Sequence, residues 1–336
     1  MKQGFHSARI AIAAAAVAAI VAAGAQARTL TMATDKVGST FNAIGAGLAK
    51  IVTEGGKDRV VVKAFAGPDA YLGALQQGEV DLAALSASTA WTSYHGKNRA
   101  KRRYDKLRIL RSADGGVRLT FLVAEKSGIR SVKDLKGRRL TAGFGGHAVI
   151  PRSMAGGLAT AGLTWDDVQK VPVTGAVDGV QALGAGRVDA SWTSYGMPIA
   201  REVHARIGVR YLPIEPGPKS LAALRKHIFP GVQLVLTRAE PKIGLPEDAY
   251  LISYDSYLAS GPELDGKTVH SVLSALWDNT DKLVKVHRGL KGFSRERSVT
   301  DIPMVPYHPA AIAFYKAKGV WTAEAQAAND KVVNAK

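Results

Sequence analysis

The sequence predicts an α/β protein made of two lobes, and three observations support this fold class. Segments typical of strands alternate with segments of helical periodicity, which is the pattern of sheets whose parallel strands are connected by helices. The pattern A-L-x-x-G-x-V-D occurs at residues 74–81 and again at 182–189, once in each half. With 336 residues, of which 46% are hydrophobic, the chain is long enough for two domains.

The first half supplies one α/β unit. Apolar, β-branched segments predict strands, which we place at residues 30–34, 59–66 and 80–85. Apolar residues recur at helical spacing from Phe41 to Val52, so a helix is expected to follow the Gly/Ser loop at residues 37–40. A shorter helix is predicted at residues 69–77, and Gly78 of the repeated pattern ends it.

The rest of the chain continues this alternation. We predict strands at residues 107–111, 117–124, 138–142, 168–173, 188–193 and 209–214, and helices at 151–161, 177–183 and 198–206. The last third contributes β-rich segments at 233–238 and 250–258 and helices at 268–279 and 310–318. Each lobe is therefore expected to have its own sheet.

Residues 1–27 have the three parts of a secretory signal. Lys2 and Arg9 give a positive start, residues 10–24 are apolar, and Ala25-Gln26-Ala27 is a small-residue cleavage pattern. The apolar run is too short to cross a membrane, which takes about 20 residues. Cleavage after Ala27 would leave 309 residues (336 − 27) with a formal charge of +15 (17 − 2). We therefore predict a periplasmic protein.

The composition excludes several classes of function. Cysteine is absent, so a disulfide framework, a thiolate zinc site and a cysteine nucleophile are excluded. The chain has 45 Lys and Arg against 28 Asp and Glu. Its densest basic run, residues 97–103, is flanked by one aromatic residue and lacks the stacking side chains of a nucleic-acid site. We predict no nucleic-acid partner, and we expect the charge to attract small anions or an anionic membrane face.

Motifs of common enzyme classes are also missing from the sequence. It contains no G-x-S-x-G, S-x-x-K, H-E-x-x-H or P-loop pattern, and its eight histidines form no pair at metal-ligand spacing. Residues 143–146 begin like a dinucleotide fingerprint, but Ala148 stands in place of the final glycine, and an exported protein is a poor setting for NAD. We predict neither catalysis, nor a cofactor, nor a metal.

Two glycine-containing loops, each leading from a strand into a helix, are the candidate binding elements. They are Gly38-Ser39-Thr40 and Gly145-Gly146-His147, one in each predicted lobe. A helix N-terminus exposes unpaired N–H groups and carries about half a positive charge, so two such ends can bind a carboxylate or a phosphate between them. The alternative is that Ser39 and Thr40 only cap a helix.

Four further residues are candidates for the ligand site. Arg118, at the start of a predicted crossing strand, can make a bidentate contact with a carboxylate, or it can form a surface or interlobe salt bridge instead. Trp91, Trp192 and Tyr254 would cover the apolar part of the ligand, and core packing is the alternative for each.

Four segments carry a resemblance to a known family. They are residues 78–81 (GEVD) with 90–96 (AWTSYHG), residues 127–139 (SGIRSVKDLKGRR), residues 161–168 (AGLTWDDV) and residues 306–316 (PYHPAAIAFYK). Over nearly the whole mature chain, they resemble the TAXI family of TRAP-transporter solute receptors, within the type II periplasmic-binding-protein fold. The resemblance implies a solute captured between two lobes and delivered to the membrane subunits of a TRAP permease.

The predicted binding loops depart from the family's pattern. Asp35 and Lys36 stand where the family has glycines, and Ser86-Ala87-Ser88 stands where it has Q-S-D. By resemblance, Ser86 and Ser88 line the cleft together with the two loops. These departures imply an unusual ligand, so the family's glutamate or 2-oxoglutarate is not carried over.

The resemblance also implies how the chain is divided. Lobe 1 is expected to comprise residues 28–122 and 255–336, and lobe 2 residues 123–254, with crossing strands near 119–124 and 250–258. We expect a monomer that closes by a hinge motion around a small anionic solute. An ABC-type receptor of the same fold is the alternative, and a periplasmic enzyme or a structural surface protein is the alternative from another class.

Overall fold

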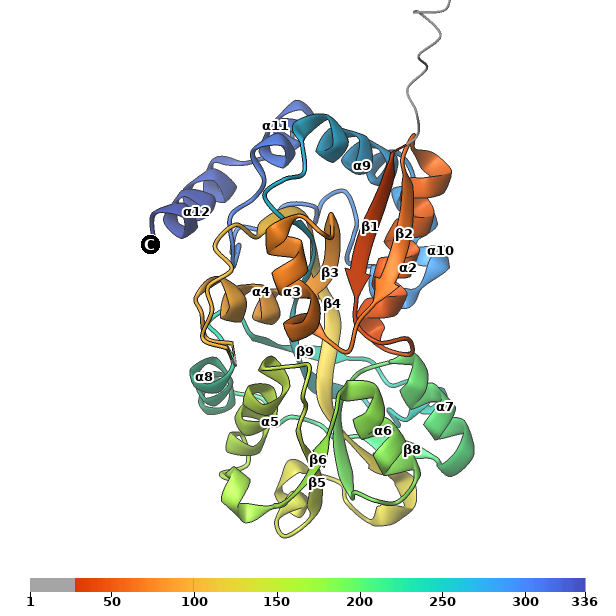
Figure 1. The fold of residues 1–336 in the computed structure, drawn as a ribbon. Helices are drawn as coiled ribbons and strands as arrows, with labels where there is room; N and C mark the ends of the chain where they lie inside the picture. Colours follow the sequence, from red (N-terminus) through yellow and green to blue (C-terminus); the bar gives the residue numbers. More distant parts are fainter. Residues whose placement is uncertain (1–27, 99, 336) are drawn as a thin grey trace, which may run out of the picture.

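The computed structural model describes residues 28–98 and 100–335, and the predicted signal at residues 1–27 lies outside them. Figure 1 shows two lobes, one above the other, with long strands running between them. We call the upper one lobe 1 and the lower one lobe 2. This is the two-lobed α/β architecture that the sequence predicts.

Lobe 1 is built from both ends of the described chain (Figure 1). Its N-terminal elements are β1 (Thr29–Thr34), α2 (Thr40–Gly55), β2 (Arg59–Ala64), α3 (Pro68–Gln77), β3 (Leu82–Ser86) and α4 (Ala87–Tyr94). Its C-terminal helices are α9 (Gly266–Asp278), α10 (Thr280–Val286), the short η5 (Arg288–Leu290), α11 (Pro309–Ala317) and α12 (Ala323–Asn334). Among the described residues, we find no helix with both the length and the apolar character needed to cross a membrane.

Lobe 2 is formed by the middle of the chain. Its strands are β5 (Arg139–Gly143), β6 (Gln169–Val173), β7 (Ala190–Ser194), β8 (Val209–Tyr211) and β9 (Gln233–Thr237). Its helices are α5 (Val149–Ala159), α6 (Ala176–Gly184), α7 (Pro198–Ile207) and α8 (Pro218–His227), with short turns η1 (Glu125–Ser127), η2 (Val132–Leu135), η3 (Trp165–Asp167) and η4 (Pro241–Ile243).

Two long strands, β4 (Arg108–Ala124) and β10 (Ala249–Ser260), cross between the lobes. They pair with each other antiparallel. Strand β10 also pairs with β3 at one end and β9 at the other, while β4 pairs with β7 and β8. The strand order is therefore β2-β1-β3-β10-β4-β7-β5-β6, a single hydrogen-bonded sheet. The expectation of one separate sheet per lobe is wrong, because the crossing strands pair with strands of both halves.

Strand β4 is one element of 17 residues, where the sequence predicts two strands. The predicted break falls at a bulge: Tyr254 of β10 pairs with Val117, but Ser256 pairs with Ala113. Such a bulge interrupts the pairing locally and bends the strand without ending it.

The repeated sequence pattern forms the same structural device in each lobe. Gly78 and Gly186 adopt left-handed backbone conformations, with φ of 76° and 70°, which end a helix and turn the chain into the next strand. In lobe 1, Asp81 Oδ2 then accepts hydrogen bonds from the backbone N–H (2.7 Å) and hydroxyl (2.9 Å) of Thr31 at the start of β1.

The equivalent bond in lobe 2 joins the last residue of the pattern to the start of β5. Asp189 Oδ2 accepts from the backbone N–H of Arg139 at 2.8 Å, and its Oδ1 accepts from the guanidinium at 2.7 Å. Each acceptor lies 50 residues after its donor. Both lobes place the strands in the same order, β2-β1-β3 and β6-β5-β7. The two halves therefore share one plan.

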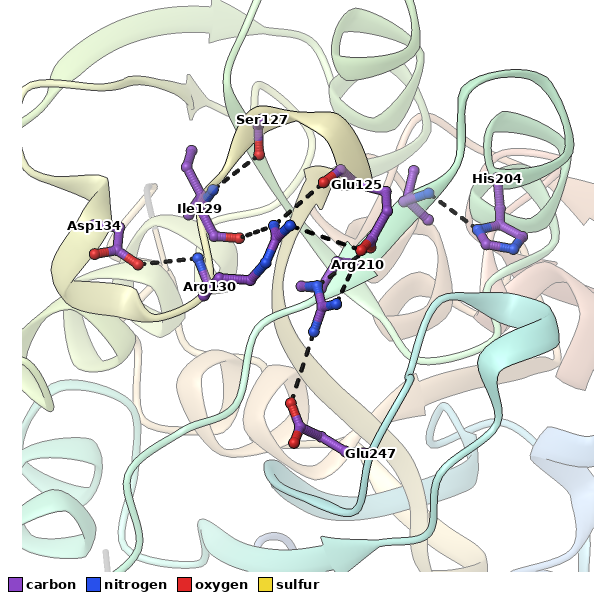
Figure 2. Close-up of polar contacts among 9 residues, drawn as sticks. Glu125, Ser127, Ile129, Arg130, Asp134, His204, Arg210 and Glu247 are labelled. Atoms are coloured by element: carbon purple, nitrogen blue, oxygen red, sulfur yellow. Dashed lines mark hydrogen bonds and ion pairs between the residues drawn. The ribbon is translucent and has the colours of Figure 1, made fainter.

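An ion-pair network fixes β8 against the lobe 2 end of β4 (Figure 2). The carboxylate of Glu125 accepts hydrogen bonds from Arg210 at 2.9 and 3.2 Å, and Arg130 donates to the Glu125 backbone oxygen at 3.2 Å. Glu247 lies 3.7 Å from the same Arg210 guanidinium. None of these four residues lines the interlobe pocket, so we assign the network to the stability of lobe 2.

Candidate ligand site between the lobes

A pocket lies between the two lobes, where the strands of each end. Lobe 1 contributes Asp35, Ser39, Thr40, Phe41, Pro68, Tyr71, Leu85, Ser86 and Thr89. Lobe 2 contributes His147, Val149, Ile150, Ala176, Trp192, Thr193, Ser194 and Met197, and the crossing strands add Val117, Leu119 and Tyr254. The cavity has a volume of about 60 Å³, which is room for a few waters or a small solute.

Six helices have their N-terminal ends at the pocket. Each contributes a lining residue from its cap or first turn: Thr40 of α2, Pro68 of α3, Ser86 at α4, Val149 of α5, Ala176 of α6 and Met197 at α7. The arrangement follows from the topology, since every parallel strand ends at the cleft and is followed by a helix. The positive ends of the six helix dipoles favour negative charge here.

The shared plan of the lobes gives the pocket an internal symmetry. Asp81 and Asp189 are 108 residues apart (189 − 81), and the same offset relates six pairs of lining residues. These are Ser39 with His147, Phe41 with Val149, Pro68 with Ala176, Leu85 with Thr193, Ser86 with Ser194, and Thr89 with Met197. Equivalent positions of the two lobes therefore line the same pocket.

Side-chain contacts close the lobes on this pocket. Thr40 Oγ1 and Ser194 Oγ lie 2.5 Å apart, and Asp35 Oδ2 lies 3.3 Å from His147 Nε2. Both members of the acid–imidazole pair are buried, each with 6% of its surface exposed. These two contacts join α2 and the end of β1 to lobe 2.

Further contacts join the lobes at the edge of the cleft. Lys36 Nζ lies 2.7 Å from Asp178 Oδ1, the backbone N–H of Ile199 donates to Gly38 O at 3.2 Å, and the backbone N–H of Asp69 donates to Gly146 O at 3.2 Å. The structure is therefore a closed form, in which the lobes contact each other directly around the pocket.

Four buried polar atoms at the pocket make no hydrogen bond to the residues that the structure describes. They are Asp35 Oδ1, Tyr71 Oη, His147 Nδ1 and Trp192 Nε1. Leaving a buried donor or acceptor unpaired costs about 1–3 kcal/mol, more for a charged group. These atoms are therefore the groups that a bound solute or water has to satisfy.

The two tyrosines of the pocket are protonated hydrogen-bond donors. Burial raises the pKa of the Tyr71 phenol well above its ordinary value, and the nearby charges of Asp35 and Asp69 raise it further. Burial likewise raises the pKa of Tyr254. Neither hydroxyl ionises near neutral pH, so each can donate to a ligand oxygen.

Six of the twelve residues that the sequence predicts for the site line the pocket. They are Ser39, Thr40, Ser86, His147, Trp192 and Tyr254. Ser39 and Ser86 also cap helices, because their hydroxyls accept from the backbone N–H groups of Asn42 and Thr89, each at 3.0 Å. The capping role considered as an alternative for Ser39 is therefore real, and it coexists with a place at the pocket.

Arg118 lies outside the pocket lining because of strand geometry. Side chains alternate between the two faces of a strand, and its neighbours Val117 and Leu119 both line the pocket. The Arg118 side chain therefore lies on the other face of β4. Its backbone oxygen accepts a hydrogen bond from the Tyr195 N–H at 2.6 Å.

The other five predicted residues lie around the pocket. Gly38 and Gly146 form the backbone contacts between the lobes, Gly145 lies beside Gly146, and Ser88 is buried within α4. Trp91 packs behind the pocket, with its ring 6.3 Å from that of Phe229, which in turn lies 5.6 Å from Tyr254. These placements favour packing for Trp91.

The candidate residues chosen from the sequence omit five polar residues of the pocket: Asp35, Tyr71, Thr89, Thr193 and Ser194. Asp35 directly follows β1, the position at which parallel strands present ligand-binding residues, so its place in the sequence was the available signal. Tyr71, in the first turns of α3, carries no comparable signal. Within the part of the chain that the structure describes, His, Cys, Asp and Glu side chains form no group of three that could hold a metal ion.

Several solved structures have a similar fold. A periplasmic transporter is 14% identical, with 94% of this chain and 99% of that chain covered and a TM-score of 0.54. A protein from Bordetella bronchiseptica RB50 is 16% identical, with 92% and 99% covered and a TM-score of 0.50. PhnD1 from Prochlorococcus marinus, in complex with methylphosphonate, is 10% identical, with 77% and 89% covered and a TM-score of 0.51. At these identities the likeness shows the fold alone, that of two-lobed periplasmic binding proteins.

Comparison of the sequence with known protein families assigns the chain to a family. No curated protein sequence matches the chain. The model of the NMT1-like family matches residues 32–319, which is most of the described chain. The protein therefore belongs to the NMT1-like family.

Proposed function

We propose that this protein is an extracytoplasmic solute receptor, which binds a small carboxylate-containing solute between its lobes and delivers it to a membrane permease. The observation that carries the proposal is the convergence of six helix N-termini on one pocket between two closed lobes. Such ends supply positive potential without any Lys or Arg. The protein acts by binding, and no catalytic step is part of the proposal.

Unpaired donors in the pocket support an anionic group on the solute. Trp192 Nε1 can only donate, and it is buried without a hydrogen bond to any described residue. The Tyr71 hydroxyl can donate from the opposite lobe. A carboxylate has about four acceptor positions, so it can satisfy donors from both lobes at once. Binding would then stabilise the closed form by linking the lobes.

A thermal-shift screen tests the proposal. Monocarboxylates, dicarboxylates, amino acids, phosphonates, neutral sugars and organic cations are compared, and hits are measured by calorimetry. A ligand that binds only the folded protein raises stability by about 2.7 kcal/mol at 100 times its Kd. We expect carboxylates among the hits. Binding of neutral sugars or cations without any carboxylate would refute the anionic solute.

The closing motion is tested on the same hits. We expect small-angle scattering to show a smaller radius of gyration with ligand than without it, because the solute joins the lobes. Identical scattering curves despite measured binding would refute closure.

The permease is proposed to be of the TRAP type, on the resemblance to the TAXI receptors. The fold supports an ABC-type permease equally, so reconstitution with each candidate permease decides between them. Solute uptake that needs this protein and proceeds without ATP supports the TRAP assignment. Uptake that requires ATP hydrolysis would assign the protein to an ABC transporter.

A further inference from the structure

We propose that the solute carries a protonated amine and that Asp35 binds it, so that the pocket selects amine-bearing solutes over plain carboxylic acids. This inference rests on the proposed function as a solute receptor. It concerns one side chain of the pocket and its unused oxygen.

Asp35 is placed to bind a donor group of the ligand. It follows β1 directly, lines the pocket and is 6% exposed. Its Oδ2 lies 3.3 Å from His147 Nε2, while its Oδ1 is buried and accepts no hydrogen bond from any described residue. An ionised carboxylate is an acceptor only. The ligand group that binds Asp35 Oδ1 is therefore a hydrogen-bond donor.

The charge balance of the pocket points to a cationic donor. Among the described residues that line it, Asp35 and His147 are the groups that can carry charge near neutral pH, and the lining includes neither Lys nor Arg. The basic group of this lining that lies beside an ionised Asp35 is the His147 imidazole, so no lysine or arginine of the lining balances the acid's charge. That charge opposes a plain carboxylate, whereas an ammonium group neutralises it and donates to Oδ1.

The surroundings of Asp35 suit an ammonium group. Tyr71 lies near enough for the charge of Asp35 to raise the pKa of its phenol. Tyr71 and Phe41 both line the pocket in lobe 1, and aromatic faces attract ammonium groups when water is excluded. The unpaired Tyr71 oxygen can also accept a hydrogen bond from the amine.

The two ends of the proposed solute are held by different lobes. The amine binds Asp35 in lobe 1, and the carboxylate reaches the Trp192 N–H and the helix ends of lobe 2. A small molecule with both groups therefore satisfies the acceptor and the donors that the pocket leaves unpaired. A carboxylic acid without the amine satisfies only the donors.

Calorimetry on matched ligands tests this directly in the wild-type protein. Alanine, valine and aspartate are each compared with the acid that lacks the amine (propionate, isovalerate, succinate) and with the corresponding α-carboxamide. We expect at least one amino acid to bind, and its desamino partner to bind about 10- to 150-fold more weakly, which is the effect of one charged hydrogen bond.

Two variants separate ligand binding from the closing of the lobes. Asp35→Asn should bring the ratio between amine-bearing and desamino ligands close to one. Asp178→Asn is the matched control, because Asp178 also pairs across the cleft, with Lys36, but does not line the pocket. It should keep the wild-type ratio even if both affinities fall. Circular dichroism and thermal melting establish that each variant is folded.

The outcomes distinguish this inference from the proposed function. Desamino acids that bind the wild-type protein as tightly as their amino acids overturn the inference and leave the carboxylate receptor intact. A ratio lost equally in both variants also overturns it. Carboxamides that bind as tightly as the amino acids support the amine site but contradict the proposed carboxylate. If none of these compounds binds but another carboxylate without an amine does in the wider screen, the amine site is refuted and the carboxylate receptor stands.

Discussion

Replacing Gly67 by Ala should weaken ligand binding by blocking closure of the lobes. Gly67 precedes α3 in lobe 1, and a Cβ atom built there lies 2.3 Å from the backbone oxygen of Gly146 and 2.6 Å from His147 Cε1, both in lobe 2. The Gly67 backbone is extended, with φ of 161° and ψ of −178°, a conformation open to any residue. The substitution therefore conflicts with the closed form and leaves lobe 1 itself unstrained.

The size of the effect follows from this contact. An ordinary Cβ contact begins at 3.4 Å, so the Cβ and the Gly146 oxygen have to separate by about 1 Å, and a backbone atom cannot rotate aside. Overpacking of this kind costs about 1–3 kcal/mol. If that cost falls on the closed form alone, ligand affinity drops by about 5- to 150-fold.

Calorimetry with a ligand identified for the wild-type protein measures the change. Gly145→Ala is the matched control, because its new Cβ would meet only Thr174 O, at 3.6 Å and within lobe 2, so its affinity should equal that of the wild type. Small-angle scattering of the ligand-saturated Gly67→Ala protein should show a larger radius of gyration than the wild type. Wild-type affinity together with a wild-type scattering curve would refute the reasoning.

Three other predictions concern stability, recognition and export. Asp189→Ala should lower the free energy of unfolding in urea by about 1–3 kcal/mol, because the backbone N–H and guanidinium of Arg139 lose their acceptor; a loss under 0.5 kcal/mol would contradict this. The Arg139 hydrogen bonds hold the Asp189 pKa below its ordinary value of 3.8. The stabilisation by Asp189 is therefore complete above about pH 4 and is lost as the pH falls further. The stability of the Asp189→Ala variant should be less sensitive to acid over that range. Trp192→Phe should keep the edge-on packing against Phe121 (ring centres 5.0 Å apart) while weakening ligand binding about 10- to 150-fold, the effect of one hydrogen bond to a charged group, and unchanged affinity would exclude its N–H from recognition. Mass spectrometry of the exported protein should find an N-terminus at or near Arg28, whereas a full-length, membrane-retained form would refute the signal.

Elements with a clear periodic pattern were predictable from the sequence. Helix α2 is an example, since Ser39 caps it and Ile44, Leu48 and Ile51 form its buried face. Helix α4 was missed because all of its residues except Trp91 are buried, so no polar face marks the helical period. Helix α8 was missed for the opposite reason: Ser220 and Leu224 are its only buried positions among ten described residues.

The candidate site was predictable only in part, because its contacts depend on how the lobes meet. Ser39 and His147 follow predicted strands, and topology alone brings such positions to the cleft. The contact between Asp35 and His147 joins residues 112 positions apart and exists only where the lobes meet. Local patterns carry no information on such a contact.

The internal symmetry of the fold explains why the acid of the pocket is in lobe 1. The position equivalent to Asp35 in lobe 2, at the common offset of 108 residues, is Gly143 (143 − 35). Gly143 has φ of 82°, a backbone conformation that residues with side chains rarely adopt. An acidic residue there would have to change the course of the loop that leads into α5. At this position the same α/β plan therefore leaves room for an acid in one lobe only, and this asymmetry gives a bound solute with two different ends a fixed orientation between the lobes.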